Sequence, residues 1–384
     1  MRDLQEIIPF VAQADPSDPS VILATVVRTG EEVYGRLGAR ILLTECDQST
    51  EAICDGYVDS GVIEQAKTCC RRGVFPYLHQ CCYCDRNPVD SGYSHAPADT
   101  TTILFERLNS VAVKAQFDFI TECYQEHQAG AIATVIGVEG AMRTPIAARL
   151  FLKMDGSVAN HIEDSFLTNL IFQDTVKILA AGQTRIQTYP FIDGVVTALV
   201  EVVTPPVRLL LFGSSAQTAA AILFAKQLGW TVIVYVPPSQ EANLHLFPEA
   251  DETLRWDFEN LPEQIQLTPH TAVVLATTTF DNDLALMRLL WSSAVGYLGF
   301  IGSSTRIQQL LDRIWQEGRM LTPKTHRRLH SPIGLDIGAE TPTETALAIV
   351  SEIQAVLKHR TGACLREKRY SVESAANFFA TIDP

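Results

Sequence analysis

The spacing of apolar positions along the chain changes at about residue 205. On the N-terminal side of this point, which we call the front half, segments with helical spacing alternate with short strand-like runs. On its C-terminal side, the rear half, continuous apolar runs such as residues 207–212 and 231–236 are each followed by a turn and a helical pattern. Such runs are typical of strands buried on both faces, and their alternation with helices indicates a parallel sheet. We therefore predict a Rossmann-like, doubly wound α/β domain over residues 205–360, followed by a tail over 361–384.

The chain in front of residue 205 contains an internal repeat. At a shift of 109 residues, two segments align without a gap, residues 24–27 with 133–136 and residues 39–43 with 148–152. An ungapped hydrophobic register in both segments indicates an ancient duplication. We interpret the front half as two related α+β lobes, residues 1–107 and 108–204, which can pack through like faces into one larger core.

Each lobe shows the same order of a helix, two strands, a second helix and a closing strand. In the first lobe these elements are predicted over residues 3–14, 21–28, 39–44, 57–72 and 101–106. In the second lobe they are predicted over residues 110–128, 130–137, 148–153, 166–181 and 196–201. Arg40 and Arg149 occupy equivalent positions, as do Asp55 and Asp164. We predict an arginine–aspartate pair within each lobe, and the alternative is an arginine that clamps a phosphate or carboxylate.

Composition and charge narrow the classes of function. The chain is 47% hydrophobic and 19% charged, and its 30 Lys and Arg against 44 Asp and Glu leave a net charge of −14. This acidic excess argues against broad binding to nucleic acid or to anionic membranes. Apolar runs of about 18 residues, which predict transmembrane helices, do not occur. The first residues lack the pattern of a signal peptide, so we expect a cytoplasmic protein.

Cysteines are concentrated near the front of the chain, where seven of the nine lie within the first 84 residues. An odd number of cysteines without an export signal favours free thiols in a reducing compartment. The C-x2-C spacing of Cys81 and Cys84 fits half of a structural zinc site, for which Cys69, Cys70 and His79 could supply further ligands. The alternative is that these thiols pack as apolar side chains in a helix and a loop.

Gly213, Ser214 and Ser215 form the predicted turn between the first strand of the rear domain and the helix that follows. This is the place of a G-x-G-x-x-G dinucleotide fingerprint, but Ser215 and Thr218 stand where the second and third glycines are expected. The N-terminus of the predicted helix would still offer unpaired N–H groups to an anion. The next strand ends at residues 235–237, where no carboxylate is present to bind the ribose of a dinucleotide. This absence weakens the prediction of an NAD(P) site and favours a vestigial Rossmann scaffold.

A second candidate loop, residues 331–342, combines two glycines and two carboxylates before the last predicted helix. Its candidate ligand-binding residues are Gly334, Asp336, Gly338, Glu340 and Thr341. The alternative is a conformationally demanding loop in which Thr341 caps the helix and Glu344 completes a capping box.

Residues 331–356 resemble the C-terminal motif of the XdhC/CoxI family of molybdenum-hydroxylase accessory proteins. Residues 298–306 resemble the strand-turn motif that precedes it in this family, and residues 24–29 and 38–40 resemble its N-terminal motif. The duplicated front half and the Rossmann-like rear also match, so the resemblance covers residues 5–357. It implies a cytosolic chaperone that binds molybdenum cofactor (molybdopterin) and does not itself turn over a substrate. We expect a homodimer.

The resemblance also implies partners. The family holds the cofactor during terminal sulfuration, for which a cysteine desulfurase supplies the sulfur, and delivers it to a xanthine-dehydrogenase-type apoenzyme, a molybdenum hydroxylase. Two other hypotheses remain open for this chain. One is an NAD(P)-dependent oxidoreductase built on the turn at Gly213, and the other is a non-catalytic interaction protein on a vestigial scaffold.

The chain departs from the family pattern at three places. The G-G-C-V-E motif of the family falls on residues 55–59, where Gly56 matches but Tyr57 replaces the cysteine. The C-G-G motif is absent near residues 97–99, and the slot of the T-H-D-H motif, residues 277–280, holds no titratable group. Cys54 is the candidate for a shifted thiol. The cofactor-binding residues that we predict are Arg40, Cys54, Asp55, Gly56, Gly213, Ser214, Ser215, Gly302, Ser303, Arg306, Gly334, Asp336, Gly338, Glu340 and Thr341.

Overall fold

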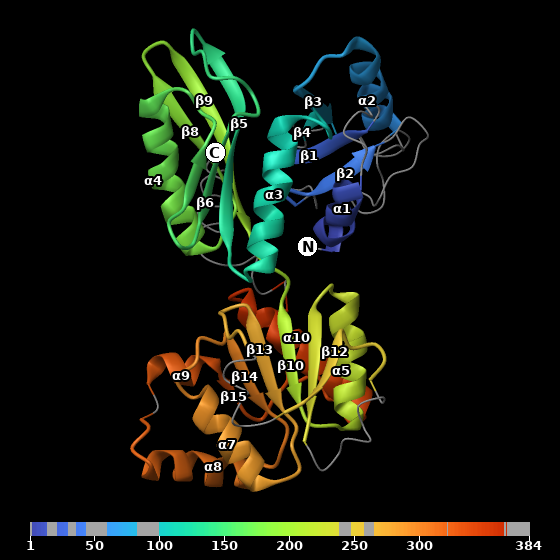
Figure 1. The fold of residues 1–384 in the computed structure, drawn as a ribbon, viewed down its shortest axis with the longest axis vertical. Coiled ribbons are helices and arrows are strands. Elements are labelled where there is room, and N and C mark those ends of the chain that lie inside the picture. The colour runs from blue at the N-terminus through green and yellow to red at the C-terminus, as the bar shows by residue number, and fades with distance from the viewer. Residues whose placement is uncertain are drawn as a thin grey trace, which may run out of the picture. The chain divides into compact units, whose positions relative to one another are not determined.

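The chain divides into two compact units, Met1–Pro205 and Pro206–Pro384, and each is described by itself (Figure 1). The computed structural model describes residues 2–13, 21–29, 36–43, 60–82, 100–237, 247–256, 265–320, 322–364 and 366. Within these ranges, no helix has both the length and the apolar character needed to span a membrane.

The first lobe of the front unit is a four-stranded antiparallel sheet with two helices. Its strands lie in the order β2-β1-β4-β3. The elements are α1 (Arg2–Gln13), β1 (Ile22–Arg28), β2 (Arg40–Leu43), α2 (Ser60–Arg72), β3 (Tyr77–Cys82) and β4 (Thr100–Arg107). The predicted elements form close to their expected bounds, and β3 is a strand that the sequence pattern did not predict.

The second lobe is a five-stranded antiparallel sheet in the order β7-β6-β5-β9-β8. Its elements are α3 (Val111–Gln125), β5 (Gly130–Gly140), β6 (Arg149–Lys153), β7 (Val158–Asn160), α4 (Ser165–Ala181), β8 (Arg185–Phe191) and β9 (Gly194–Val203). The register repeats that of the first lobe, including an irregularity. The ladder between β1 and β4 shifts between Val26 and Arg28, and that between β5 and β9 shifts between Val135 and Gly137. The same bulge at equivalent residues confirms the predicted duplication.

Each sheet of the front unit packs a helix on its outer face, and the two sheets share a central layer. Val62 of α2 packs against the first sheet, and Leu167 of α4 packs against the second. Between the sheets, α1 and α3 bury apolar side chains in one cluster that joins Leu23 of β1, Ile120 of α3 and Phe151 of β6. The inner faces of both lobes therefore belong to one core, and neither is covered without the other.

Two buried ion pairs cross between the lobes in a reciprocal way. Arg40 of the first lobe donates through Nη1 and Nη2 to Glu201 Oε1 and Oε2 of the second, at 2.8 and 2.5 Å. Arg149 of the second lobe makes the same two-pronged pair with Glu106 of the first, with Nη1 at 2.9 Å from Oε1. All four side chains are at most 10% exposed. Because bidentate pairs are directional, they fix the register of one lobe against the other.

The predicted pairing within the second lobe, Arg149 with Asp164, is therefore wrong. Asp164 instead caps α4, where its carboxylate accepts a hydrogen bond from the backbone N–H of Leu167 at 2.9 Å. Asp55, the predicted partner of Arg40, lies outside the described residues. The true partners are the glutamates at equivalent places in the two closing strands, β4 and β9.

The rear unit is a six-stranded parallel sheet with helices on both faces. Its strand order, β12-β11-β10-β13-β14-β15, is that of a dinucleotide-binding Rossmann fold, which confirms the predicted fold class. The strands are β10 (Arg208–Phe212), β11 (Thr231–Val236), β12 (Glu252–Arg255), β13 (Thr271–Leu275), β14 (Tyr297–Phe300) and β15 (Leu329–His330). The helices are α5 (Ala216–Gln227), α7 (Phe280–Leu290), α8 (Ser304–Gln316), α9 (Pro323–Arg328) and α10 (Pro342–Leu357).

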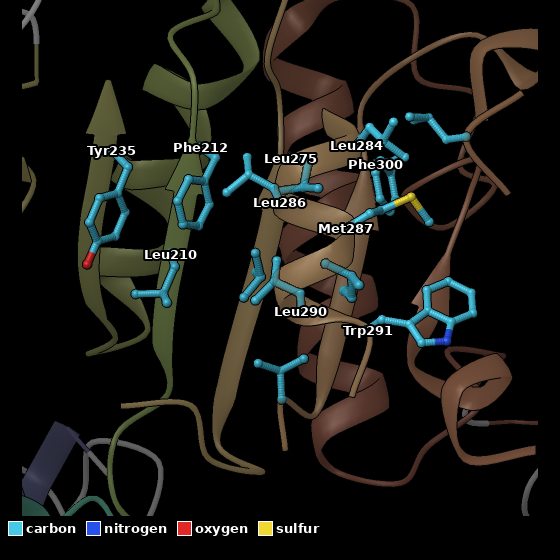
Figure 2. Close-up of a cluster of buried hydrophobic side chains, with 14 of the residues drawn as sticks. Leu210, Phe212, Tyr235, Leu275, Leu284, Leu286, Met287, Leu290, Trp291 and Phe300 are labelled. Atoms are coloured by element: carbon cyan, nitrogen blue, oxygen red, sulfur yellow. The ribbon is translucent and has the colours of Figure 1, made fainter. Parts of the chain in front are cut away.

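Alternate residues of the rear strands pack on opposite faces of the sheet. Figure 2 shows one face, where Phe212 of β10 and Leu275 of β13 point toward Leu286 and Met287 of α7. The ring of Phe212 also stacks on Tyr235 of β11, with centroids 4.7 Å apart. The opposite face of the sheet packs against α5 and α10. Both faces are apolar, as the continuous runs in the sequence predicted.

Replacing Arg149 by alanine should lower the free energy of unfolding of the front unit by about 3–5 kcal/mol, because Glu106 would stay buried without its partner. The double change Arg149→Met with Glu106→Leu should recover most of this loss, since it leaves no unpaired charge. Denaturant titration of the full chain measures both. Arg185→Ala, an exposed arginine of the same lobe, is the control and should change stability by less than about 0.5 kcal/mol. An equal loss in the single and double variants would contradict the pairing argument.

Candidate functional site

Four loops leave the same edge of the rear sheet, because the carboxyl ends of its parallel strands meet there. They follow β10, β13, β14 and β15 and comprise residues 213–215, 276–279, 301–303 and 331–341. The residues predicted from sequence for the rear domain lie in these loops or in the first turn of the helix that follows, namely Gly213, Ser214, Ser215, Gly302, Ser303, Arg306, Gly334, Asp336, Gly338, Glu340 and Thr341. This edge is therefore the candidate site.

Gly213 brings the first two of these loops together. Its φ of +114° lies in the region that favours glycine, and an added Cβ would stand 2.3 Å from the carbonyl oxygen of Ala276. The backbone N–H of Gly213 donates to the carbonyl of Tyr235 at 2.9 Å. No other residue type fits this close approach of two backbones. The glycine of the predicted fingerprint is thus required by the turn itself.

The helix N-termini at this edge differ in charge. Helices α5 and α8 are capped by neutral hydroxyls, because Ser215 accepts from the N–H of Thr218 at 3.2 Å and Ser303 from the N–H of Arg306 at 3.3 Å. Neither helix has an acidic residue in its first turn. By contrast, the first turn of α7 contains Asp281 and Asp283, and that of α10 contains a glutamate. The positive dipole ends of α5 and α8 therefore remain available to an external anion.

Arg306, in the first turn of α8, is engaged by the protein itself. Its Nε and Nη2 donate to Asp283 Oδ2 at 2.9 and 2.5 Å, and its other contacts are the carbonyl oxygens of Thr277 and Thr278. The hydroxyl of Thr277 donates to the other oxygen of Asp283. Burial raises the pKa of the Asp283 carboxyl, while Thr277 and Arg306 act to lower it. The pair joins α7 to α8 and neutralises the charge that we predicted for a ligand.

Asp283 is a residue that sequence reasoning missed. The slot of the family motif at residues 277–280 holds no titratable side chain, as expected, but Asp283 is turned back toward Thr277 from the first turn of α7. A carboxylate in the first turn of a helix, just beyond a strand end, was the available signal. Its fixed partner, Arg306, stands 23 residues further along the chain and could not be read from local spacing.

The loop after β15 is held by a half-buried glutamate of α10. Glu352 accepts a hydrogen bond from the backbone N–H of Gly334 at 2.9 Å and another from the hydroxyl of Tyr297. The Nδ1 of His330 lies 3.2 Å from the other oxygen of Glu352, and the His330 ring stacks on Tyr297 with centroids 4.4 Å apart. Burial would raise the pKa of Glu352, but these hydrogen bonds lower it overall. The glutamate thus stays ionised and anchors the start of the loop.

The end of the loop forms the capping box that the sequence predicted. The side chain of Thr341 accepts from the N–H of Glu344 at 3.2 Å, and the Glu344 carboxylate accepts from the N–H groups of Thr341 and Glu340 at 2.9 and 2.8 Å. Asp336 and Glu340 are exposed, and Gly338 has a φ of +72°. The N–H groups of Glu340, Thr341 and Glu344 are therefore already satisfied within the protein, and the role of this loop in ligand binding stays a prediction.

In the front unit, the predicted candidates are only partly described. Arg40 forms the ion pair with Glu201 and also donates to the carbonyl of Gly38 at 2.8 Å. In this structure its guanidinium therefore joins the two lobes. Cys54, Asp55 and Gly56 lie outside the described residues. The position equivalent to Asp55 in the second lobe is the helix cap described above.

The predicted metal ligands are also only partly described. Cys69 is buried in the core between α2 and the first sheet, and this burial raises the pKa of its thiol. Cys70 is half-buried, and the ring of His79 stacks on Phe105 with centroids 6.0 Å apart. Cys84 and the side chain of Cys81 lie outside the described residues. Over the ranges that the structure covers, no three His, Cys, Asp or Glu side chains are grouped so that they could hold a metal ion.

Two family models match this chain, one in each of its two units. A family model for the XdhC Rossmann domain matches residues 209–353, which contain the rear sheet and its loops. A second model, for the XdhC and CoxI family, matches residues 123–190 in the second lobe. Together the two models account for more than half of the chain.

Curated relatives and a solved structure agree with this match. A Bacillus subtilis protein, named as a probable subunit of xanthine dehydrogenase, is 26% identical over 335 residues, covering 86% of this chain and 92% of that protein. An uncharacterised protein of Escherichia coli, YqeB, is 25% identical over 61% of this chain and 45% of its own length. The crystal structure of a xanthine dehydrogenase from Bacillus halodurans superposes with a TM-score of 0.70 at 17% identity, covering 98% of this chain and 99% of that one. This last similarity shows a shared fold.

Replacing Arg306 by alanine should destabilise the rear unit by about 2 kcal/mol near neutral pH, because Asp283 would stay buried without a cation. The pKa of Asp283, already raised by burial, should rise further. The folded state then binds a proton more tightly than the unfolded state, so the loss should shrink as the pH is lowered toward about 5. Denaturant titration across this pH range tests both effects. Arg313→Ala, on the same helix but 57% exposed, should cost little at any pH, and a pH-independent loss in Arg306→Ala would contradict the argument.

Proposed function

Because the chain belongs to the XdhC and CoxI family, we propose that it is an accessory protein of a xanthine-dehydrogenase-type molybdoenzyme. We further propose that it binds molybdenum cofactor while the cofactor is sulfurated and inserted. The alignment with the Bacillus subtilis relative over nearly the full length of both chains supports an accessory role. The match of the Rossmann domain model to the rear unit supports placing the cofactor there.

The observation that carries the cofactor proposal is the pair of helix N-termini, α5 and α8, at the edge of the rear sheet. Molybdenum cofactor is a pterin that bears a phosphate group and a dithiolene that binds the metal. A phosphate fits a helix N-terminus that no acidic side chain neutralises. Ser215 and Ser303 cap these two helices with neutral hydroxyls, as shown above. The residues present therefore fit the anionic part of the cofactor.

We assign the residues of this edge to two tasks. Ser214, Ser215 and Ser303, with the first N–H groups of α5 and α8, would bind the phosphate. Arg306 is a positioning residue, because its guanidinium is taken up by Asp283 and so holds α8 in place. When bound, the cofactor supplies the molybdenum centre that receives the sulfur and that the client enzyme later uses.

The proposed partners follow from the same assignment. A chaperone of this cofactor must meet the enzyme that supplies the sulfur and the apoenzyme that receives the product. We therefore propose a cysteine desulfurase and a molybdenum-hydroxylase apoenzyme as partners, both in the cytoplasm. Co-production of a xanthine-dehydrogenase-type enzyme with and without this chain tests the role. A molybdoenzyme that is equally active in both cases would contradict the proposal.

NAD(P) is a second candidate ligand, which the strand order of the rear sheet favours. In sheets of this order, a dinucleotide binds across the carboxyl edge with its pyrophosphate at the first helix, here α5. The strand β11 ends at Val236, directly before Pro237, so the described residues place no carboxylate at that strand end for a ribose. Titration with NADH and NADPH, followed by fluorescence, separates this candidate from the cofactor proposal.

Placing a negative charge at the cap of α5 should weaken the binding of molybdenum cofactor. Aspartate is as good a helix cap as serine, so Ser215→Asp should fold normally while its charge repels the phosphate. We expect the dissociation constant to rise by about tenfold, which corresponds to about 1.4 kcal/mol. Equilibrium dialysis with cofactor released from a molybdoenzyme measures the effect.

The matched control is Ser110→Asp, which changes the cap of α3 in the front unit. Ser110 accepts from the N–H of Val113 at 3.2 Å, as Ser215 does from Thr218 in α5. It should leave cofactor affinity unchanged. If both variants bound as tightly as the unchanged protein, the phosphate would not lie at α5.

A further inference from the structure

The two faces of the rear unit expose helices of different character. On one face, the outer sides of α7 and α8 carry the exposed charged residues Arg288, Asp312 and Arg313 beside one exposed aromatic residue, Trp315. This is the usual pattern of a helix that packs one apolar stripe on a sheet and turns the other side to water. On the opposite face, the outer sides of α5 and α10 lack such charges. This difference between helices of one sheet requires an explanation.

The outer side of α5 is made of small and apolar residues. Ala216 and Ala219 are exposed, and the side chain of Leu223 is 53% exposed. The charged residue of this helix, Lys226, lies near its end and pairs with Asp251 at 2.6 Å. Because the inner side of α5 is also apolar, where Ile222 packs on the sheet, the helix is apolar nearly all round. Helices of this kind are normally buried on all sides.

The outer side of α10 continues this uncharged surface. Leu347, which is 44% exposed, Ser351 and Gln354 follow one another at helical spacing and lie on one stripe. Between Glu344 and the end of α10, the sequence has one charged residue, Glu352, and its carboxylate is turned inward to Gly334 and Tyr297. Helices α5 and α10 pack side by side in one cluster on the sheet, so their outer sides form one surface.

The charges at the two ends of α10 have opposite signs. Glu340 and Glu344 stand at its start, and Lys358 and Arg360 follow its end. A second copy that lies antiparallel along α10 would bring the acidic end of each helix to the basic end of the other. A twofold axis produces this arrangement, since each contact then occurs twice. With a net charge of −14, two copies repel each other over most of their surface, and an uncharged face with such ends lowers that repulsion.

We propose that the outer surface of α5 and α10 is the interface through which two copies of this chain form a twofold-symmetric dimer. The alanines and Ser351 allow the helices of the two copies to approach closely, and Leu223 and Leu347 supply the apolar contact. The twofold axis passes near Ser351, which lies midway between Glu344 and Lys358. These two residues are about 21 Å apart at 1.5 Å per residue, so neither meets its own copy at the axis. The proposal does not depend on the ligand proposed above.

A charge on this surface should separate the copies. The double variant Leu223→Glu with Leu347→Glu should sediment as a monomer at micromolar concentration, where the unchanged full chain should sediment as a dimer. We expect the dissociation constant to rise by at least about a hundredfold, because four carboxylates would face one another across the axis. Trp315→Glu, on α8 and 70% exposed, is the matched control and should remain a dimer. Far-ultraviolet circular dichroism shows whether each variant is folded.

A single cysteine at the axis should link the copies covalently. In a background in which the exposed Cys364 is replaced by serine, Ser351→Cys should form an intermolecular disulfide on mild oxidation, because two Cα atoms near a twofold axis come within reach of the bond. Gln308→Cys, exposed on α8, is the control for thiols elsewhere on the surface. Non-reducing electrophoresis measures the linked fraction.

Three results would overturn the proposal. The first is a monomeric full chain at micromolar concentration, which would mean that this surface is covered by another partner or by the rest of the chain. The second is a Leu223→Glu with Leu347→Glu variant that stays dimeric and folded. The third is equal linkage of Ser351→Cys and Gln308→Cys, which would place the contact between copies elsewhere.

Discussion

The front unit depends on two buried arginine–glutamate pairs, and each pair joins one residue of the first lobe to one residue of the second. A charge removed from water is costly unless a partner of opposite sign meets it in good geometry. Arg40 and Arg149 are almost fully buried, so neither lobe could bury its own arginine without the glutamate of the other. The shared core between the sheets imposes the same dependence on the apolar side chains. Duplication thus produced one folded body from two copies that complete each other, in the manner of a twofold dimer joined in one chain.

In the rear unit, the direction of the strands decides where chemistry can take place. Parallel strands bring four loops and the start of four helices to one edge, and the C-terminal motifs that resemble the family, residues 298–306 and 331–356, begin at this edge. Packing then distinguishes the helices. Acidic side chains in the first turns of α7 and α10 interact with the dipoles of these helices, whereas α5 and α8 begin at neutral serine caps. The two faces of the rear unit also differ in charge, because α8 turns charged side chains to water and α10 turns an uncharged stripe.

Much of this fold could be predicted from residue patterns. The duplication, the Rossmann-like sheet and the capping box at Thr341 all rest on local periodicity or on short spacings, and each is present in the structure. The strands β8 and β12 were missed because both lie at a sheet edge and alternate little. In β8, Pro190 interrupts the pattern, and in β12 none of the four residues is buried. Edge strands bury too little surface to leave a clear apolar pattern in the sequence.

The sequence by itself determined which residues are apolar, where the last helix begins and that the front half is repeated. Tertiary structure alone decided which charges meet. Arg40 and Glu201 are 161 residues apart, and Arg149 and Glu106 are 43 apart, so no local spacing relates them. The same holds for Arg306, which the sequence presents as a free cation and which the fold joins to Asp283. Local periodicity reports how a segment turns one side to the core, but an ion pair depends on how distant segments are brought together by packing.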